Sequence, residues 1–436
     1  MTGAVEQRAR TENEYEWPEI VAPGDFGSAH SEELRREINL DYAATTPALR
    51  AAVEAVLRLL PAYGSIHRGG GSRSRISTDA YEQARATAAA FIGCGADHHL
   101  VFVRNTTEAI NLVAASLPRS SRILCSPLEH HANLLPWREH EVDHLPFTTS
   151  AEELLAEAGA ALRRAAAERR PYEVLAVSGA SNVTGEILPV AELAAIAHEV
   201  DVQILIDAAQ LAPHRRVDVE ELGADYLALS GHKLYAPFGS GALVVRRELL
   251  KGVPPLLKGG GAVRVVTFDD VAWAQLPQRL EAGTPNLLGA VALAGSCDEI
   301  TRFGRTRIER QEEALARKLW DCLQEVPGLT LLRGWPEHRD RVAVATFTLT
   351  GHDPRTLAEH LAREYSVALR SGLFCAHPYV AHLLQTPVAT VEAALRMSSS
   401  EEARLPGAVR ASIGIGVQPD HVDHLISALS DLEGWW

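Results

Sequence analysis

The sequence has few cysteines, and they form no pattern. Cys94, Cys125, Cys297, Cys322 and Cys375 are scattered over 436 residues, and no two of them have CxxC spacing. An odd, unpatterned set argues against a disulfide framework and against a zinc knuckle. We therefore expect no metal site and a reducing, cytoplasmic environment.

Basic charge and long apolar runs are also lacking. The 42 lysines and arginines are outnumbered by 56 acidic residues, which gives a formal net charge of −14 at pH 7. Nucleic acids and anionic membranes both require a basic face, so neither is expected as a partner. No apolar run reaches the roughly 20 residues that a transmembrane helix needs. The polar residues 1–37 lack the apolar stretch of a secretory signal.

What the chain does contain is short apolar runs that alternate with helical patterns. Such alternation indicates an α/β fold with a mostly parallel sheet and helices on both faces. The pattern predicts an N-terminal extension at 1–38, a large domain at 39–295 and a smaller, helix-rich α+β domain at 296–436. Helices are expected at 48–60, 78–92, 150–170 and 186–199, and strands at 101–103, 122–125, 174–178, 203–206, 226–229, 241–245, 342–349 and 366–370.

The strongest local signal for chemistry is the run SGHK at 230–233. It follows the strand pattern at 226–229, so Lys233 is expected at the carboxyl end of a strand, where open α/β sheets have their ligand crevices. A lysine in a desolvated pocket loses its proton readily, and the neutral amine can form an imine with an aldehyde. Taken alone, the tetrapeptide fits a surface turn equally well.

Asp207 favours the catalytic interpretation of Lys233. It follows the strand pattern at 203–206 and precedes Lys233 by one helix and one strand, so both residues are expected at the same sheet edge. Pyridoxal phosphate requires a carboxylate facing its pyridine nitrogen, because the protonated ring is the electron sink for carbanions. A lone aspartate at a strand end is more often a helix cap, so the argument depends on its pairing with Lys233.

A phosphate site is expected where a strand pattern runs into a helix. Thr106 and Thr107 lie at such a junction, and a helix N-terminus offers backbone N–H groups and hydroxyls to phosphate. Ser230 and His232 are placed to donate from the opposite side. An ordinary threonine cap is the alternative.

These signals belong to a longer series of motifs. In chain order they are DYAATT at 41–46, HRG at 67–69, RNTTE at 104–108, EHHAN at 129–133, SNVTG at 181–185, DAAQ at 207–210, SGHK at 230–233, EAGTPN at 281–286 and RSGLFCA at 370–376. The series resembles cysteine desulfurases and selenocysteine lyases of the class V aminotransferase family, in the subgroup with a compact loop after the cysteine. The resemblance covers about residues 39–415 and implies the pyridoxal-phosphate-dependent transferase fold of type I.

The resemblance also implies a role for individual residues. Lys233 is the implied Schiff-base lysine and proton shuttle at the substrate Cα, His130 stacks on the pyridine ring, and Cys375 receives sulfur. The other implied contacts are Asp207 with the ring nitrogen, Asn182 and Gln210 with the phenolic oxygen, Thr106, Thr107, Ser230 and His232 with the phosphate, Thr284 with the phosphate of a second subunit, and Arg410, Arg370 and Asn182 with the substrate. Simpler alternatives are helix-start polarity for His130, a structural salt bridge for Arg410 and a small buried hydrophobe for Cys375.

Some positions depart from the family pattern. Leu373 and Phe374 precede Cys375 where this subgroup usually has histidines, and Gly179 also replaces a usual histidine. These changes make the substrate side more apolar, which raises the pKa of a thiol and slows its attack. Cationic neighbours such as His377 would offset this effect if they faced the sulfur.

The leading prediction is a homodimeric, cysteine desulfurase-like enzyme that converts L-cysteine to L-alanine and leaves a persulfide on Cys375. Members of the compact-loop subgroup generally pass sulfur to a dedicated acceptor protein. The first alternative is a pyridoxal-phosphate-dependent lyase (selenocysteine lyase or cysteine β-lyase) or a tailoring enzyme of secondary metabolism, in which Cys375 is not the nucleophile. The second is a sulfur-relay or scaffold protein with little turnover of its own.

Overall fold

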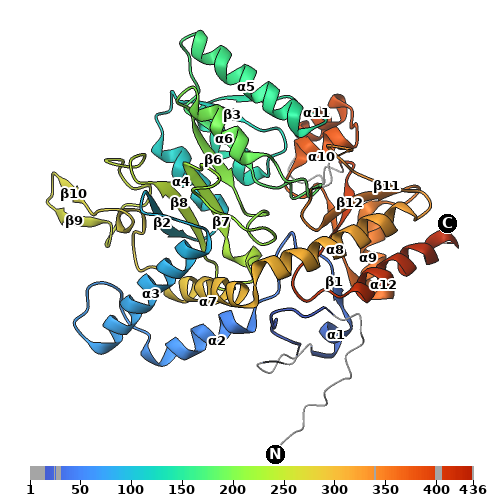
Figure 1. Ribbon diagram of the computed structural model, residues 1–436, viewed down its shortest axis with the longest axis horizontal. Coiled ribbons are helices and arrows are strands. Elements are labelled where there is room, and N and C mark those ends of the chain that lie inside the picture. Colours follow the sequence, from blue (N-terminus) through green and yellow to red (C-terminus); the bar gives the residue numbers. More distant parts are fainter. Residues whose placement is uncertain (1–14, 24, 26–30, 338–339, 398–404, 435–436) are drawn as a thin grey trace, which may run out of the picture.

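The centre of the protein is a seven-stranded sheet with the order β2-β8-β7-β6-β5-β3-β4. The structure is a computed structural model that describes residues 15–23, 25, 31–337, 340–397 and 405–434 (Figure 1). Neighbouring strands from β7 to β4 are parallel, and β8 is antiparallel to both of its neighbours. The mostly parallel α/β sheet is therefore confirmed. Its strands are β2 (His98–Val103), β3 (Arg122–Cys125), β4 (Glu141–His144), β5 (Val174–Ser178), β6 (Gln203–Asp207), β7 (Tyr226–Ser230) and β8 (Gly241–Arg246).

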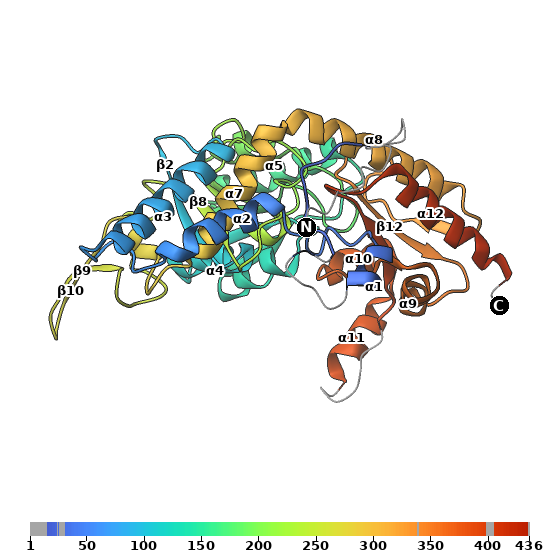
Figure 2. The ribbon, with the colours of Figure 1, turned by 90° about the horizontal axis from the view of Figure 1, so that it is seen from below.

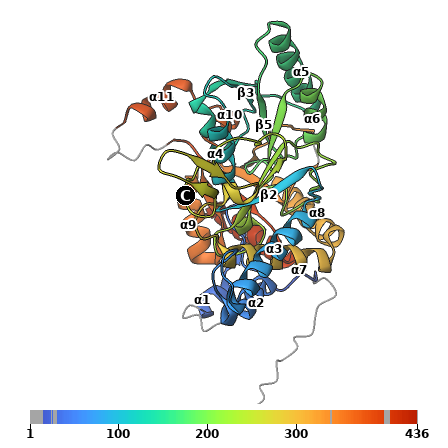
Figure 3. The same cartoon turned by 90° about the vertical axis from the view of Figure 1, so that its left-hand side faces the viewer.

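Alternating side chains of this sheet supply two separate cores. Leu175 and Val177 of β5 face one core, while Val174 and Ala176 face the other, because side chains along a strand point alternately to opposite faces. The first core packs against α5 and α6, and the second packs against α4, on the opposite side of the sheet (Figure 3). The helices of this part are α2 (Arg50–Leu59), α3 (Ser72–Phe91), α4 (Thr106–Ser116), α5 (Ala151–Ala167), α6 (Val190–His198) and α7 (Leu287–Phe303).

The start of α5 shows one half of a predicted cap. The spacing of Ser150 and Glu153 predicts a capping box. The Ser150 hydroxyl accepts a hydrogen bond from the Glu153 N–H, at 3.2 Å, as that motif requires. The Glu153 carboxylate instead accepts from the N–H of Thr149, one residue before the cap. The prediction of a helix start is thus confirmed, but the reciprocal bond goes to a different residue.

A second sheet, of four antiparallel strands, forms the other end of the molecule. Its order is β11-β12-β15-β14, and α8 lies along β11 and β12 (Figure 2). The predicted division between residues 295 and 296 falls inside α7, and we propose to place it at Gly304, between α7 and α8. The elements are α8 (Arg305–Gln324), β11 (Leu329–Leu331), β12 (Val344–Leu349), α9 (Pro354–Tyr365), β14 (Arg370–Gly372), α10 (His377–Leu383), α11 (Val388–Arg396), β15 (Ala408–Ser412) and α12 (Pro419–Ser430).

The N-terminal segment lies on this second domain. The Trp17 indole N–H donates to the Val417 carbonyl at 2.9 Å, and β1 (Ile38–Asn39) pairs in parallel with β13 (Val367–Ala368). A short helix, α1 (Ser31–Arg36), precedes β1. Residues 15–17 therefore lie on the C-terminal part of the chain, whereas residues 19–21 pair with residues 48–50 at the start of α2. Residues 1–14 of the predicted extension lie outside the described residues.

A hairpin of β9 (Val263–Val266) and β10 (Val271–Trp273) projects away from the body of the molecule (Figures 1 and 2). Its exposed apolar side chains include Val265, Val266 and Phe268. Within the described part of the chain, no helix is both long enough and apolar enough to span a bilayer.

Candidate active site

One cavity, of about 210 Å³, opens at the carboxyl edge of the large sheet. Strands β6 and β7 are parallel and pair Asp207 with Ala228, so Asp207 and Ser230 end at the same edge. The 3₁₀ turn Gly231–Lys233 then places Lys233 beside them. The prediction that Asp207 and Lys233 share one edge is confirmed. All but one of the predicted site residues line the cavity: Thr106, Thr107, His130, Asn182, Asp207, Gln210, Ser230, His232, Lys233, Arg370, Cys375 and Arg410.

Thr284 is the exception. It borders a separate surface cavity together with His67, Arg68 and Gly260. Within a single chain it therefore does not reach the phosphate end of the site. This position agrees with a residue that serves a second subunit, and that role stays a prediction.

The Lys233 amine loses its proton more readily than an ordinary lysine. Burial, with a smaller contribution from Arg410, lowers its pKa to about 8, while Asp207 and Cys375 act in the opposite direction. Its Nζ donates to the Gln210 Oε1 atom at 3.4 Å. An amine with this pKa is deprotonated in a substantial fraction of molecules near neutral pH, which is what imine formation requires.

Asp207 and His130 line the same cavity, and burial shifts their pKa values in opposite directions. Burial raises the pKa of the Asp207 carboxyl. The hydrogen bond that it accepts from the Ala209 N–H, at 2.9 Å, and the charge of Lys233 both lower that pKa. Burial and Lys233 lower the pKa of His130 to about 3, so its ring is neutral. The His130 Nδ1 atom accepts the Ala132 N–H at 3.0 Å, which fixes the tautomer and the ring orientation. A neutral, oriented imidazole is suited to stacking on an aromatic ring.

The phosphate end is built from the start of α4. Asn105 caps this helix by accepting the Glu108 N–H. The Thr106 N–H donates to the Ser230 hydroxyl at 2.9 Å, and the two hydroxyls are 2.8 Å apart, whereas Thr107 is exposed. The hydroxyls of Thr106 and Ser230 thus converge at a helix N-terminus, where an anion is stabilised.

Arg410 is buried and held by several groups. It is 2% exposed, donates to the Asn182 carbonyl at 2.9 Å, and pairs with Asp41 at 3.2 Å. Its guanidinium lies over the Phe374 ring at 4.9 Å, and within the described chain its Nε has no hydrogen-bond partner. Arg370 reaches the other Asp41 oxygen at 3.5 Å. The salt bridge foreseen as the alternative for Arg410 is therefore present, on a residue that also lines the cavity.

Cys375 lies at the tip of a tight turn. Phe374 and Cys375 have φ angles of 51° and 54°, a left-handed conformation that non-glycine residues adopt only where contacts hold them. The Cys375 carbonyl accepts the His131 N–H at 2.7 Å, and the Phe374 carbonyl accepts the Asn182 side-chain amide at 2.8 Å. Cys375 itself is exposed. These bonds dock the turn of the second domain onto the large domain.

Comparison with known proteins gives the family. The family model for class V aminotransferases matches residues 38–425. The chain belongs to this family. A curated cysteine desulfurase of Pectobacterium carotovorum is 34% identical over 403 residues, which are 89% of this chain and 91% of the relative. A probable cysteine desulfurase of Synechocystis is 34% identical over 371 residues, or 79% of this chain and 85% of the relative.

Solved structures agree with the class V fold. The cysteine desulfurase of Thermococcus onnurineus superimposes with a TM-score of 0.80 at 31% identity, covering 93% of this chain and 96% of that one. The Escherichia coli cysteine desulfurase CsdA, with an S-sulfonic acid, gives a TM-score of 0.75 at 30% identity, covering 91% and 94%. The predicted transferase fold of type I is confirmed.

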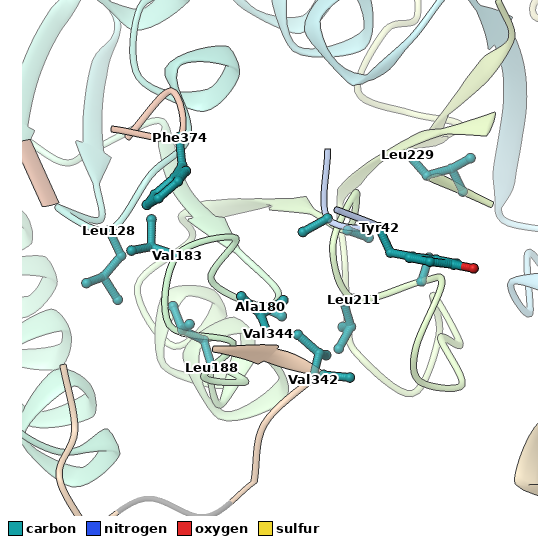
Figure 4. Packing of buried hydrophobic residues seen from close by; sticks show 14 of the residues in the cluster. Tyr42, Leu128, Ala180, Val183, Leu188, Leu211, Leu229, Val342, Val344 and Phe374 are labelled. Carbon is teal, nitrogen blue, oxygen red and sulfur yellow. The ribbon is translucent and has the colours of Figure 1, made fainter. Parts of the chain in front are cut away.

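Apolar side chains occupy two of the three positions where the sequence resemblance leads one to expect a histidine. A Cβ added at Gly179 would come within 2.8 Å of the Leu211 side chain, so Leu211 occupies that space. Figure 4 shows Phe374 beside Leu128 and Val183, and Phe374 is only 7% exposed. Phe374 lines the cavity, whereas Gly179, Leu211 and Leu373 do not, so a more apolar substrate side stays a prediction. Cys375 raises the pKa of two charged groups in the site, Lys233 and Arg410.

Three buried polar residues next to the site had no predicted role. Glu129 accepts the Ser178 N–H and hydroxyl, and burial raises its pKa to about 7. His214 and Glu312 lie behind Gln210. Glu129 precedes His130 in the EHHAN motif, so its position in the sequence could have marked it as a site residue. Nothing local connects Glu312 with Gln210, because α8 brings it there from a distant part of the chain.

Proposed function

We propose that this protein is a pyridoxal-phosphate-dependent cysteine desulfurase that converts L-cysteine to L-alanine and keeps the sulfur as a persulfide on Cys375. The observation that carries the proposal is that Lys233, Asp207, Arg410 and Cys375 line one cavity. The names of the relatives support the same activity.

The residues at the sheet edge fit the proposed cofactor. When bound, pyridoxal phosphate supplies an electron sink for negative charge at the substrate Cα. Lys233 offers a partly neutral amine to the aldehyde, and Asp207 offers a buried carboxylate to the ring nitrogen. Thr106 and Ser230 offer hydroxyls beside the N-terminus of α4, where a dianionic phosphate is stabilised.

Substrate binding rests on Arg410. Its guanidinium is buried, and its Nε is unpaired within the described chain, so it retains donor capacity for an incoming carboxylate. Asp41 already neutralises part of its charge, and Arg370 shares Asp41. The substrate carboxylate would therefore compete with Asp41 for Arg410. Lys233, once released as a free amine, is positioned to take and return the Cα proton.

Sulfur transfer rests on Cys375. Its thiolate would attack the sulfur of bound L-cysteine, the Cβ–S bond would break, and a proton would return to Cβ to give alanine. Cys375 also borders a second cavity, of about 570 Å³, between α4 and residues 130–140. We propose that a thiol-bearing acceptor protein collects the persulfide from that side.

Product analysis tests the proposed activity. The protein loaded with pyridoxal phosphate should form alanine from L-cysteine and release sulfide in equal amount when a thiol reductant is supplied. A cysteine β-lyase would instead release pyruvate and ammonia. The lyase is the second candidate because Leu373 and Phe374 replace the usual histidines before Cys375. A panel of amino-acid substrates that includes selenocysteine tests the selenocysteine lyase alternative. Pyruvate as the main product from L-cysteine would refute the desulfurase proposal.

The pKa of Lys233 predicts how fast the cofactor is captured at different pH values. Below its pKa of about 8 the amine is protonated, so the neutral fraction rises about tenfold per pH unit and then levels off. Capture of pyridoxal phosphate by cofactor-free protein, followed by its visible absorption, should be about tenfold faster at pH 7 than at pH 6, and nearly constant above about pH 9. A rate that still climbs tenfold from pH 9 to pH 10 would indicate an ordinary lysine and contradict this prediction.

A homodimer is the next expectation. Thr284 lies apart from the cavity of its own chain and is proposed to complete the phosphate site of a partner. Light scattering should therefore give twice the mass of one chain. Thr284→Val should raise the dissociation constant for pyridoxal phosphate by about tenfold, because a hydrogen bond to a charged group is lost. Thr350→Val, at an exposed turn, is the matched control. A monomer with full activity would disprove this arrangement.

A further inference from the structure

A row of buried polar side chains extends from Lys233 into the protein. The Lys233 Nζ donates to Gln210 Oε1 at 3.4 Å, and the Gln210 Nε2 lies 3.2 Å from the His214 Nε2. The His214 Nδ1 lies 2.8 Å from a carboxylate oxygen of Glu312. Gln210, His214 and Glu312 are 4%, 3% and 1% exposed, so solvent does not compete for these contacts.

The position of Glu312 is unfavourable for a carboxylate because it is buried. A buried carboxylate destabilises the folded protein unless it is paired. Its second oxygen has no hydrogen-bond partner within the described chain. The nearby Tyr42 hydroxyl donates to the Ile415 carbonyl, and the Tyr235 hydroxyl accepts the Ile415 N–H. Burial and Glu312 raise the pKa of both tyrosines, so they stay neutral. His214 is thus the group that compensates Glu312.

The proton on His214 determines how the Gln210 amide can point. The His214 Nδ1–H donates to Glu312, so a neutral ring offers a lone pair at Nε2, which accepts the Gln210 N–H. The amide oxygen then faces Lys233, as observed. A protonated ring has an N–H at Nε2 instead. The amide must then turn, so that its oxygen accepts from His214 and its N–H₂ group faces the cavity.

We propose that His214 and Glu312 form a positioning pair that sets which end of the Gln210 amide faces the cofactor. When the His214 Nε2 atom donates to the Gln210 oxygen, the Gln210 N–H₂ group would face the phenolic oxygen of the cofactor and stabilise its negative charge. The inference rests on the proposed function and adds to it the two residues that orient Gln210. Neither residue lines the cavity, so both act only through Gln210.

A spectrophotometric pH titration of the cofactor-loaded protein tests the pair without measuring turnover. The visible band reports the proton held between the phenolic oxygen and the lysine nitrogen, and an N–H donated to that oxygen favours loss of this proton. Glu312→Gln removes the charge that stabilises protonated His214. The midpoint of the band should therefore move up by about one pH unit, the equivalent of one hydrogen bond. His214→Leu, whose side chain cannot donate to Gln210, should shift the midpoint in the same direction and serves if Glu312→Gln does not fold.

Two controls separate positioning from a general structural effect. Glu313→Gln, the next residue of α8, removes the same charge from a carboxylate that is 41% exposed and bound to Arg215, and it should leave the midpoint unchanged. In a Gln210→Ala background, Glu312→Gln should no longer shift the midpoint. An equal shift in that background, or no shift in either single variant, would overturn the positioning role and leave the proposed function intact. A wild-type protein without a visible band would overturn both.

Discussion

Lys233→Ala is expected to remove the visible absorption of the bound cofactor and to lower desulfurase turnover by at least about 10³-fold. Among the described residues that line the cavity, Lys233 alone carries a primary amine, so no neighbour can replace it as the covalent anchor. The same amine is also the proposed base at the substrate Cα. Absorbance spectra and alanine formation from L-cysteine measure the two losses separately.

The matched control is Lys251→Ala, because the Lys251 side chain is 78% exposed and does not line the cavity. It should keep both the absorption band and the turnover. Lys233→Arg adds a sharper comparison, since arginine keeps a positive charge but forms no imine and is not deprotonated in proteins. If Lys233→Ala kept the band, the covalent site would have to be elsewhere, and the assignment of the whole cavity would be wrong.

Cys375→Ala is expected to abolish persulfide and sulfide formation while pyridoxal phosphate and L-cysteine still bind with nearly normal affinity. The groups proposed to hold the cofactor are Lys233, Asp207 and the start of α4, and none of them needs the thiol. Mass spectrometry of the persulfide, together with the absorbance change on adding L-cysteine, measures the two properties in one sample.

Cys322→Ala is the control for that experiment, because Cys322 is half-buried on α8 and away from the cavity. It should leave persulfide formation unchanged. A desulfurase and a lyase differ most clearly here. A lyase needs only the Cα chemistry of Lys233, so its turnover would survive Cys375→Ala. Full turnover in that variant would show that the thiol is dispensable and that the lyase is the better description.

Local sequence patterns predicted the strands that are buried on both faces, because such strands read as apolar runs. The edge strand β4 (Glu141–His144) was missed for the converse reason, because its sequence is polar and largely exposed. The inner strand β15 (Ala408–Ser412) was missed although it is buried, because Arg410 in its centre interrupts the apolar run. The helix α3 begins at Ser72 rather than at residue 78, because its first turn is built from serine and arginine and has no apolar periodicity.

By itself, the sequence determined the cofactor end of the site. Asp207 and Ser230 end buried parallel strands and Lys233 follows one of them, and such strands end at one edge of the sheet whatever else surrounds them. Only the tertiary structure decided the substrate end. The left-handed turn at Cys375 docks on His131, Asp41 pairs with Arg410, and Glu312 of α8 meets His214. Each of these contacts joins residues from distant parts of the chain, and packing between helices and sheets brings them together, which no local periodicity records.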